Sequence, residues 1–341
     1  MADAPGVRPP TADELAVRAT GAVQARFAGA RVAGVEPLLG GTSSLTYQAD
    51  LTGAGPARRV VIKVAPPGLP PVRNRDVLRQ ARVFDVLANA PGVAVPEVLG
   101  ADAGAPVEVP PLFVMSFVPG ESYEPCLARE EPKASRAELE ARALAAARML
   151  AALHALAPTD PRIASEPVQD LPAELARWAK AFGSCEEDLR ANDAEVHARL
   201  AAALPAEAPA RVLHGDYRLG NMQCAGDKIG ALIDWEIWSL GDPRLDLAWF
   251  LWNSNPQHPS CSRAKPEMPS GAALLAEYER AAGARVADLR WFGALVRYKQ
   301  AAASALIAKN TRKLAKPGVD ISRLTTLIPQ LLRAALETLD S

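Results

Sequence analysis

This sequence of 341 residues has few cysteines and no long apolar run, so little in it indicates a membrane, secreted or zinc-binding protein. No apolar run is long enough to span a bilayer, and the N-terminal stretch MADAPGVRPP has no hydrophobic segment typical of a signal peptide. The cysteines are few, far apart and without a CxxC pair, so neither a zinc site nor a disulfide framework is indicated. We therefore expect a cytoplasmic protein without a membrane partner, with free thiols at Cys126, Cys185, Cys224 and Cys261.

The sequence also has no excess of charge of either sign. Its 38 basic and 39 acidic residues give a formal net charge of −1, and no basic block or aromatic-rich basic stripe occurs. We therefore expect no nucleic-acid partner. Apolar residues make up 49% of the chain, which allows a substantial core, and the length favours two domains over one.

The most informative stretch is residues 212–250, VLHGDYRLGNMQCAGDKIGALIDWEIWSLGDPRLDLAWF. It places His214, Asp216 and Asn221 within eight residues, and Asp234 follows an apolar segment. Residues 222–224 and 229–233 are predicted strands, because the Ala-Gly-Asp-Lys sequence between them is typical of a turn. Such a hairpin would bring Asn221 and Asp234 side by side.

The spacing of these polar residues favours phosphoryl transfer. Asp216 and Asn221 are five residues apart, as are the catalytic aspartate and the Mg²⁺-holding asparagine of protein kinases. This reaction mainly requires positioning and charge neutralisation, with one carboxylate at the attacking hydroxyl and hard oxygen ligands on Mg²⁺. A lone aspartate is more often a turn former or a helix cap. The complete set of Asp216, Asn221 and Asp234 favours a site instead.

This stretch resembles the HGDxxxxN and IDWE motifs of the aminoglycoside phosphotransferase and choline kinase-like family. The resemblance implies an α+β, two-lobed protein kinase-like fold that uses ATP and Mg²⁺. Residues 1–118 would form a nucleotide-binding lobe with a five-stranded antiparallel sheet, and residues 119–341 a larger, mainly helical lobe with the acceptor site. Asp216 would be the catalytic base, His214 would brace its loop, and Asn221 and Asp234 would hold the metal.

Periodicity in the first lobe fits this expectation. Predicted strands cover residues 32–38, 45–51, 59–64, 96–99 and 112–117, and predicted helices cover 11–27 and 74–89. A loop after the first strand could approach phosphate oxygens through its paired glycines, although alone it could equally be a plain hairpin loop. The resemblance implies that this loop is the phosphate lid, formed by Gly40, Gly41, Thr42, Ser43 and Ser44.

Lys63 is the candidate phosphate ligand of this lobe. Alternation places it on the opposite face of its strand from Val60, Ile62 and Val64, and a lysine in so apolar a strand needs an anionic partner or a route to water. An edge-strand lysine that discourages aggregation is the alternative. The resemblance makes Lys63 the contact to the α- and β-phosphates. Gln80 then stands where relatives carry glutamate, and an amide can accept a hydrogen bond from Lys63 but supplies no counter-charge.

Several further assignments follow from the resemblance. Residues 115–120 would be the hinge between the lobes, where Met115 and Phe117 lie by analogy at the adenine. The second lobe has predicted helices at 134–156, 172–204, 271–282, 288–310 and 321–339, with a loop at 253–269 that could select the acceptor. We interpret His154 as structural and Asp246 as an N-cap or an anchor of the catalytic loop.

We therefore expect an enzyme, a kinase that transfers the γ-phosphate of ATP to a hydroxyl of a small molecule. A nucleotide-binding protein without turnover is one alternative, which Gln80 makes conceivable. A metal-dependent hydrolase built from His214, Asp216, Asp234 and His258 is another, but it lacks a paired-histidine motif and leaves Lys63 unexplained. The acceptor, the preference for ATP over GTP and the oligomeric state (monomer or homodimer) stay open.

The segments GGTSSLTYQ, RQARVFDVL and EYERAAG point to one branch of the family. They resemble most closely the N-terminal domains of certain acyl-CoA dehydrogenase-like proteins.

Overall fold

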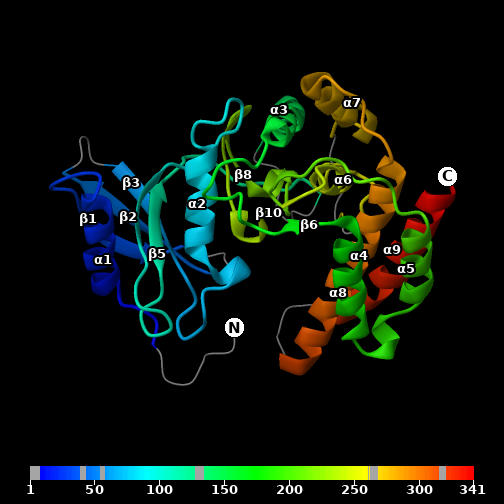
Figure 1. The fold of residues 1–341 in the computed structure, drawn as a ribbon, viewed down its shortest axis with the longest axis horizontal. Helices are drawn as coiled ribbons and strands as arrows, with labels where there is room; N and C mark the ends of the chain where they lie inside the picture. The colour runs from blue at the N-terminus through cyan, green and yellow to red at the C-terminus, as the bar shows by residue number, and fades with distance from the viewer. Residues whose placement is uncertain are drawn as a thin grey trace. The chain divides into compact units, whose positions relative to one another are not determined.

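The computed structural model describes residues 8–38, 44–53, 58–126, 134–259, 261, 268–314 and 320–341 (Figure 1). They pack as two compact units that do not follow chain order. The first unit contains Met1–Tyr123, Thr159–Ser165 and Gly220–Trp238, and the second contains Glu124–Pro158, Glu166–Leu219 and Ser239–Ser341. The expected lobe boundary between residues 118 and 119 stays a prediction.

A five-stranded antiparallel sheet forms the centre of the first unit, as the alternation predicted. Its spatial order is β1-β2-β3-β5-β4, and the strands are β1 (Arg31–Pro37), β2 (Leu45–Thr52), β3 (Arg58–Val64), β4 (Val98–Asp102) and β5 (Leu112–Ser116). Lys63 pairs in register with Thr46 of β2 and with Phe113 of β5. It therefore lies in an inner strand, and the interpretation as an edge-strand lysine is wrong.

Two helices cover opposite faces of this sheet (Figure 1). Helix α1 (Ala12–Gln24) begins with a capping box between Thr11 and Glu14, and its apolar side packs on the face that carries Ile62. Helix α2 (Val77–Leu87) packs on the other face, where Phe84 and Phe113 lie 6.1 Å apart between ring centroids. Because side chains alternate along a strand, Lys63 lies on the α2 side.

The predicted hairpin that follows Asn221 also belongs to the first unit. It consists of β8 (Met222–Ala225) and β9 (Lys228–Leu232), with the short helix η3 (Leu219–Asn221) before it and η4 (Trp235–Ile237) after it. The backbone of Glu121 exchanges two hydrogen bonds with that of Cys224, at 2.8 and 2.9 Å. The Leu232 N–H donates to the carbonyl of Ala94 at 2.8 Å. These bonds fix the hairpin to the first 123 residues.

The second unit is mainly helical. Its α-helices are α3 (Arg136–Ala155), α4 (Leu171–Gly183), α5 (Asp193–Ala202), α6 (Arg244–Asn253), α7 (Gly271–Ala282), α8 (Leu289–Leu314) and α9 (Ile321–Asp340). Helices α4, α5, α6, α8 and α9 share one apolar core, and α4, α5, α8 and α9 lie side by side in Figure 1. Helix α3 packs against α7.

Short elements complete both units. The 3₁₀ helices η1 (Arg73–Arg75) and η2 (Glu187–Leu189) precede α2 and α5. A three-stranded sheet in the second unit, with the order β6-β10-β7, was not predicted; its strands are Val168–Gln169, Ser239–Gly241 and Arg211–Leu213. Within the described ranges, no helix combines the length and the apolar character that a membrane crossing requires.

Candidate functional site

A buried carboxylate fixes the loop that carries Asp216, which we call the Asp216 loop (residues 214–218). Asp246 of α6 accepts hydrogen bonds from the backbone N–H groups of His214, at 2.6 Å, and Gly215, at 2.9 Å. Gly215 has a φ of +86°, a conformation that favours glycine. Asp246 is 1% exposed, so these bonds are shielded from water. The structure therefore shows the anchoring contact that the position of Asp246 suggested.

His214 braces the same loop from inside. Its ring is fully buried, and its Nδ1 accepts a hydrogen bond from the backbone N–H of Asp216 at 3.2 Å. The ring also meets Tyr217 edge-on, with 6.1 Å between ring centroids. These contacts fit a bracing residue.

The histidine of α3 supports the anchor. His154 Nε2 lies 3.9 Å from Asp246 Oδ2, and His154 Nδ1 lies 2.8 Å from the hydroxyl of Tyr278. Burial would raise the pKa of Asp246, but the neighbouring His154 and His214 and the Gly215 N–H together hold that pKa below its usual value. The anchor is therefore ionised at neutral pH, and His154 is structural.

Trp249 and Arg218 hold the carboxylate of Asp216 within the second unit. Trp249 of α6 donates from Nε1 to Oδ1 at 2.8 Å, and Arg218 donates from Nε to Oδ2 at 3.1 Å. Arg218 Nη1 also lies 3.6 Å from a carboxylate oxygen of Glu124. The Asp216 side chain remains 26% exposed. It is thus oriented by neighbours and still open to a reaction partner.

In the first unit, Lys63, Gln80 and Asp234 form a second polar group, which we call the Lys63 cluster. Lys63 Nζ donates to Gln80 Oε1 at 3.2 Å and lies 3.4 Å from Asp234 Oδ1. Lys63 and Gln80 are buried, whereas the Asp234 side chain is 43% exposed. The expected pairing of Gln80 with Lys63 is confirmed, although their contact with a nucleotide stays a prediction.

Contacts of α2 hold Gln80 in this position. Arg79 donates to the carbonyl of Trp238 at 2.7 Å and accepts at its own carbonyl from Trp238 Nε1 at 3.2 Å, while its guanidinium lies 4.0 Å from the ring centroid. Phe84 meets Trp235 edge-on at 6.3 Å between ring centroids. The helix is therefore tied to the segment that follows Asp234.

Asp234 itself has an unusual backbone conformation. Its φ of +66° and ψ of +53° are left-handed, which aspartate tolerates better than most residues, and such conformations cluster at functional sites. The residue before it, Ile233, donates its N–H to the carbonyl of Asn221 at 2.8 Å. The predicted proximity of Asn221 and the segment leading into Asp234 is therefore present.

The donors in this part of the first unit suit a hard cation. Asp234 offers a partly exposed carboxylate, and Asn221, 4% exposed, offers an amide oxygen from the start of the hairpin. Oxygen donors of this kind are the protein ligands that Mg²⁺ accepts, usually with water and phosphate oxygens completing its shell. Asn221 and Asp234 thus fit Mg²⁺, and their role as ligands stays a prediction.

The other residues predicted to contact the nucleotide lie in the glycine loop and at the hinge. Gly40, Gly41, Thr42 and Ser43 lie outside the described residues, and Ser44 is buried. Met115 pairs with strands on both sides, and the Phe117 N–H donates to the carbonyl of Arg59 at 3.3 Å. That N–H is therefore engaged, and adenine binding at the hinge stays a prediction.

The alternative of a metal-dependent hydrolase gains no support. The ring of His258 packs on Trp252 with 4.7 Å between centroids, and it is 2% exposed. Within the described ranges, no three histidine, cysteine or acidic side chains are grouped so that they could hold a metal ion.

Sequence reasoning missed three residues around Asp216, namely Arg218, Trp249 and Lys299. Lys299 of α8 donates from Nζ to the carbonyl of Gly215 at 3.3 Å. Its sequence context, VRYKQAAASAL, did contain a signal, because a lysine among apolar helix neighbours requires a partner. Trp249 carried none, since a tryptophan in an apolar helix is usually part of a core.

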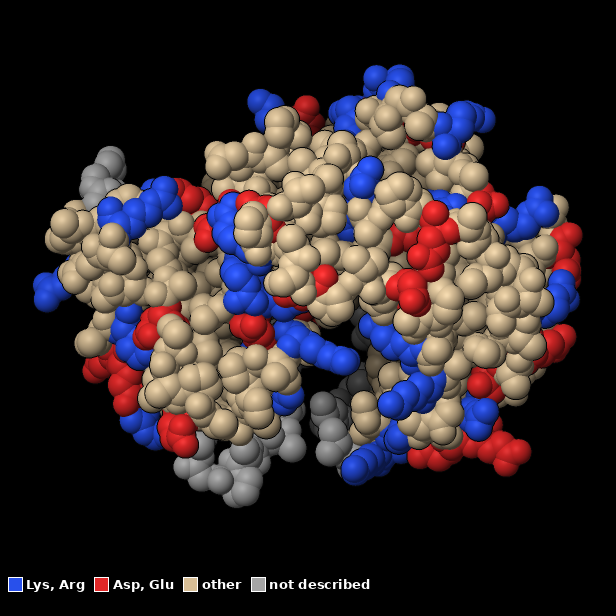
Figure 2. Space-filling model, in the orientation of Figure 1, with Lys and Arg blue, Asp and Glu red and all other residues tan. Residues whose placement is uncertain are grey.

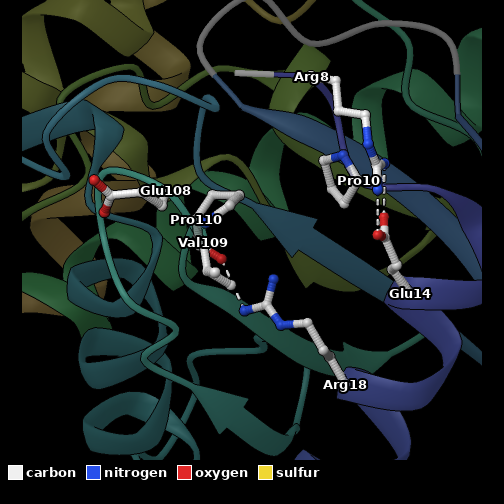
Figure 3. Close-up of a pocket in the computed structure, with 7 residues that line it drawn as sticks. All are labelled: Arg8, Pro10, Glu14, Arg18, Glu108, Val109 and Pro110. Atoms are coloured by element: carbon white, nitrogen blue, oxygen red, sulfur yellow. Dashed lines mark hydrogen bonds and ion pairs between the residues drawn. The ribbon is translucent and has the colours of Figure 1, made fainter. Parts of the chain in front are cut away.

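A surface cavity of 470 Å³ lies elsewhere in the first unit, beside the start of α1 (Figure 3). Three of the charged residues that line it are paired: Arg8 faces Glu14, and Arg18 bonds Asp102 at 2.7 Å and the carbonyl of Pro110 at 2.8 Å. None of the predicted site residues lines it. The lining residues are Arg8, Pro10, Glu14, Arg18, Glu108, Val109 and Pro110.

Comparison with known proteins places this geometry in context. Residues 34–295 match the phosphotransferase enzyme family (APH). Over 214 residues the chain is 28% identical to acyl-CoA dehydrogenase family member 10 of Mus musculus. This match covers 61% of the chain but only 19% of the mouse protein.

Solved structures share the fold. A Ralstonia eutropha protein described as an aminoglycoside phosphotransferase superposes with a TM-score of 0.73 at 21% identity, over 92% of this chain and 94% of that one. A thermostable mutant of aminoglycoside phosphotransferase APH(4)-Ia, in a ternary complex with ADP and hygromycin B, gives 0.59 at 17% identity over 92% and 97%. The expected kinase-like α+β fold is confirmed.

Proposed function

The chain belongs to the phosphotransferase enzyme family, as its motifs predicted, and on this premise we propose that it transfers the γ-phosphate of ATP to a hydroxyl of a small molecule. The similarity to acyl-CoA dehydrogenase family member 10 agrees with the branch that the sequence suggested. In this reaction the acceptor oxygen bonds to the γ-phosphorus, the bond from that phosphorus to the β–γ bridging oxygen breaks, and ADP leaves.

The Lys63 cluster is the observation that carries the proposal. Lys63 and Asp234 are 171 residues apart in sequence, yet their charged atoms are 3.4 Å apart. A buried lysine is costly unless it has anionic partners, and here one partner is a carboxylate that is itself partly exposed. Lys63 is thus placed to exchange this carboxylate for phosphate oxygens.

Asn221 and Asp234 would hold Mg²⁺. When bound, Mg²⁺ neutralises charge on the β- and γ-phosphates and on the leaving ADP. The chain itself contributes Asp234, whose charge holds the cation, and Lys63, which binds and orients phosphate oxygens. Gln80 keeps the ammonium group of Lys63 in place without adding a negative charge.

Asp216 would accept the proton of the acceptor hydroxyl. A carboxylate has about four lone-pair positions, and Trp249 and Arg218 each use one. These two contacts hold the side chain in one rotamer, and its 26% exposure leaves the carboxylate accessible to the hydroxyl. Asp246 and His214 hold the backbone beneath it.

The charges near Asp216 favour a neutral or anionic acceptor over a polycationic one. Arg218 and Lys299 both lie at this loop, and Arg218 pairs with Asp216 at 3.1 Å and with Glu124 at 3.6 Å. Basic and acidic side chains are interspersed over the face of the molecule drawn in Figure 2. A polycationic antibiotic would meet repulsion from Arg218 and Lys299. We therefore propose hydroxylated metabolites without positive charge as acceptors.

Two measurements test the proposal. Binding of MgATP is measured by calorimetry, and ADP release is then measured against a panel of neutral, anionic and polycationic hydroxyl compounds that includes kanamycin. Acceptor-dependent ADP release with MgATP binding supports the kinase. Binding without turnover on any acceptor would favour the nucleotide-binding protein, and efficient use of kanamycin would overturn the proposed acceptor class.

A further inference from the structure

Trp249 orients the carboxylate of Asp216 from a different element of the second unit. Its indole Nε1 donates to Asp216 Oδ1 at 2.8 Å, and the two residues are 33 positions apart in sequence. Arg218, by contrast, is two residues from Asp216 and belongs to the same loop. The indole is therefore the contact that ties the carboxylate to the helical core, because Trp249 extends from α6.

Lys299 of α8 contacts both Trp249 and the residue that precedes Asp216 in the loop. Its Nζ donates to the Gly215 carbonyl at 3.3 Å, next to Asp216 in the chain. The same Nζ lies 4.3 Å from the ring centroid of Trp249 and 5.6 Å from that of Trp178. Both separations fall within the range of a cation–π interaction. One ammonium group thus fixes the backbone of the loop and the plane of the indole.

Burial of an ammonium group costs hydration free energy unless nearby anionic groups compensate for the loss. An apolar side chain would pack against two tryptophans equally well without any loss of hydration. Burial lowers the pKa of Lys299, and Arg177 adds to this, while Glu174, Asp216 and Asp246 oppose the change. The carboxylates around Lys299 therefore favour its charged form, and Asp216 is one of them.

We propose that Trp249 and Lys299 are positioning residues for Asp216, Trp249 by fixing the carboxylate and Lys299 by fixing the indole and supplying a counter-charge. This inference rests on the proposed role of Asp216 as the base. Neither residue needs to touch the substrates. Lys299 places a positive charge near the Asp216 carboxylate, as does Arg218 from the loop itself, and Trp249 keeps the carboxylate in one rotamer.

The test uses the full chain and a signal that does not depend on turnover. The chain has six tryptophans, and ¹⁵N labelling of their indoles gives one N–H resonance each. The Trp249 resonance is assigned as the one missing from Trp249→Phe. Because this N–H donates to Asp216, we expect its chemical shift to titrate in the acidic range, and we expect Asp216→Asn to abolish that titration. A resonance that ignores Asp216→Asn would overturn the role of Trp249.

The charge of Lys299 is tested by three variants in the same spectra. Lys299→Met removes the counter-charge and should move the midpoint of the Trp249 titration to higher pH, by about one unit, the low end of the effect of a neighbouring opposite charge. Lys299→Arg keeps the charge and the cation–π contact, so its midpoint should stay near that of the unmodified chain. Lys313→Met, at an exposed lysine near the end of α8, is the matched control.

Each outcome decides the proposal. An unchanged midpoint in Lys299→Met, or an equal shift in Lys299→Arg and Lys299→Met, would overturn it. The other five indole resonances report whether a variant is folded, and Lys299→Gln replaces Lys299→Met if they are lost. None of these results depends on the kinase reaction, so a failure here differs from a failure of the proposed function.

Activity then supplies a second readout. With the best acceptor of the panel, Trp249→Phe should lower kcat about tenfold and leave the KM for ATP unchanged, because only the base is affected. The acid limb of the pH profile of kcat should shift to higher pH in Lys299→Met and be restored in Lys299→Arg. A change in the KM for ATP without a change in kcat would contradict a role at Asp216.

Discussion

The Lys63 cluster and the Asp216 loop hold their carboxylates in different ways. Asp234 makes one ion pair, at 3.4 Å, from a side chain that is 43% exposed. Asp216 is 26% exposed and accepts hydrogen bonds from two side chains, and the backbone of its loop is anchored on Asp246. The first carboxylate can therefore change partners at little cost, whereas the second is held in one position.

This difference matches what phosphoryl transfer asks of each group. A ligand of Mg²⁺ and a phosphate-binding lysine must rearrange when the nucleotide arrives, so a long, partly exposed ion pair is suitable. A base must lie within hydrogen-bond distance of the acceptor hydroxyl when the reaction begins, so its rotamer must be fixed in advance. We infer that substitutions in the Lys63 cluster change ligand binding and those in the Asp216 loop change turnover.

The largest effect is expected for Asp234→Ala. Removal of this carboxylate takes away the charge that Mg²⁺ requires and leaves Lys63 with only the neutral amide of Gln80 among its contacts in the cluster. We expect Mg²⁺-dependent turnover to be abolished and calorimetric titration with MgATP to show much weaker binding. Binding of MgATP at its original affinity would contradict the assignment of Asp234 to the metal.

The second prediction concerns the Asp216 loop. Asp216→Asn should lower acceptor phosphorylation at least about 100-fold, the low end for removal of a general base. Its amide oxygen can still accept from Trp249, so the loop should keep its position and MgATP should bind as before. The measurements are ADP release and MgATP calorimetry. Near-normal turnover would show that another group is the base.

The regular parts of the first unit could be predicted because their signals are local. Alternation in β3 placed Lys63 on the opposite face of the strand from Ile62. The position of Gln80 beside Lys63 came from the resemblance of RQARVFDVL to the family, and the structure shows that contact. The hairpin after Asn221 followed from two apolar segments and a turn. Each of these inferences needed only a few neighbouring residues.

The contacts around Asp216 could not be predicted in the same way. Trp249 and Lys299 reach the loop from α6 and α8, 33 and 84 residues away from the residues they contact, and only the packing of those helices brings them there. The left-handed backbone of Asp234 has no signature in the sequence either. The strands β6, β7 and β10 were missed because two or three residues are too few to show alternation.

The third prediction separates the residues of the Lys63 cluster. Lys63→Met deletes a phosphate contact and should raise the KM for ATP or lower kcat by more than about tenfold, about 1.4 kcal/mol. Gln80→Ala only loosens the lysine and should stay below tenfold. Gln80→Glu restores a counter-charge and should be tolerated. Steady-state kinetics with varied ATP measure all three.

An effect of Gln80→Ala equal to that of Lys63→Met would contradict this order. It would mean that the amide contributes to the nucleotide site directly rather than through the ammonium group. Arg79→Ala, which breaks the tie between α2 and Trp238, is the matched control for a general displacement of the helix.

The smallest effect concerns the stability of the second unit away from the Asp216 loop. His258 packs on Trp252 and is 2% exposed. Burial lowers its pKa to about 4, a hydrogen bond with Gln300 opposes this, and the charge of Arg297 adds to it. An unfolded histidine binds its proton near pH 6.5. Between pH 6.5 and 4, the unfolded state therefore binds more protons than the folded state does.

It follows that the free energy of unfolding is unaffected by His258 above pH 6.5 and falls as the pH drops from 6.5 toward 4, by up to about 1.4 kcal/mol per unit. The His258→Gln variant has no such proton uptake. Urea unfolding at pH 6.5 and at pH 5.5 gives the decrease in the free energy of unfolding between these two pH values. We expect this decrease to be smaller in the variant than in the unmodified chain by on the order of 1 kcal/mol. His197→Gln, at a half-buried histidine of α5, is the control and should retain the full loss. The NMR titration of the His258 ring measures the midpoint directly, and a value near 6.5 would show that the ring does not resist protonation in the folded chain.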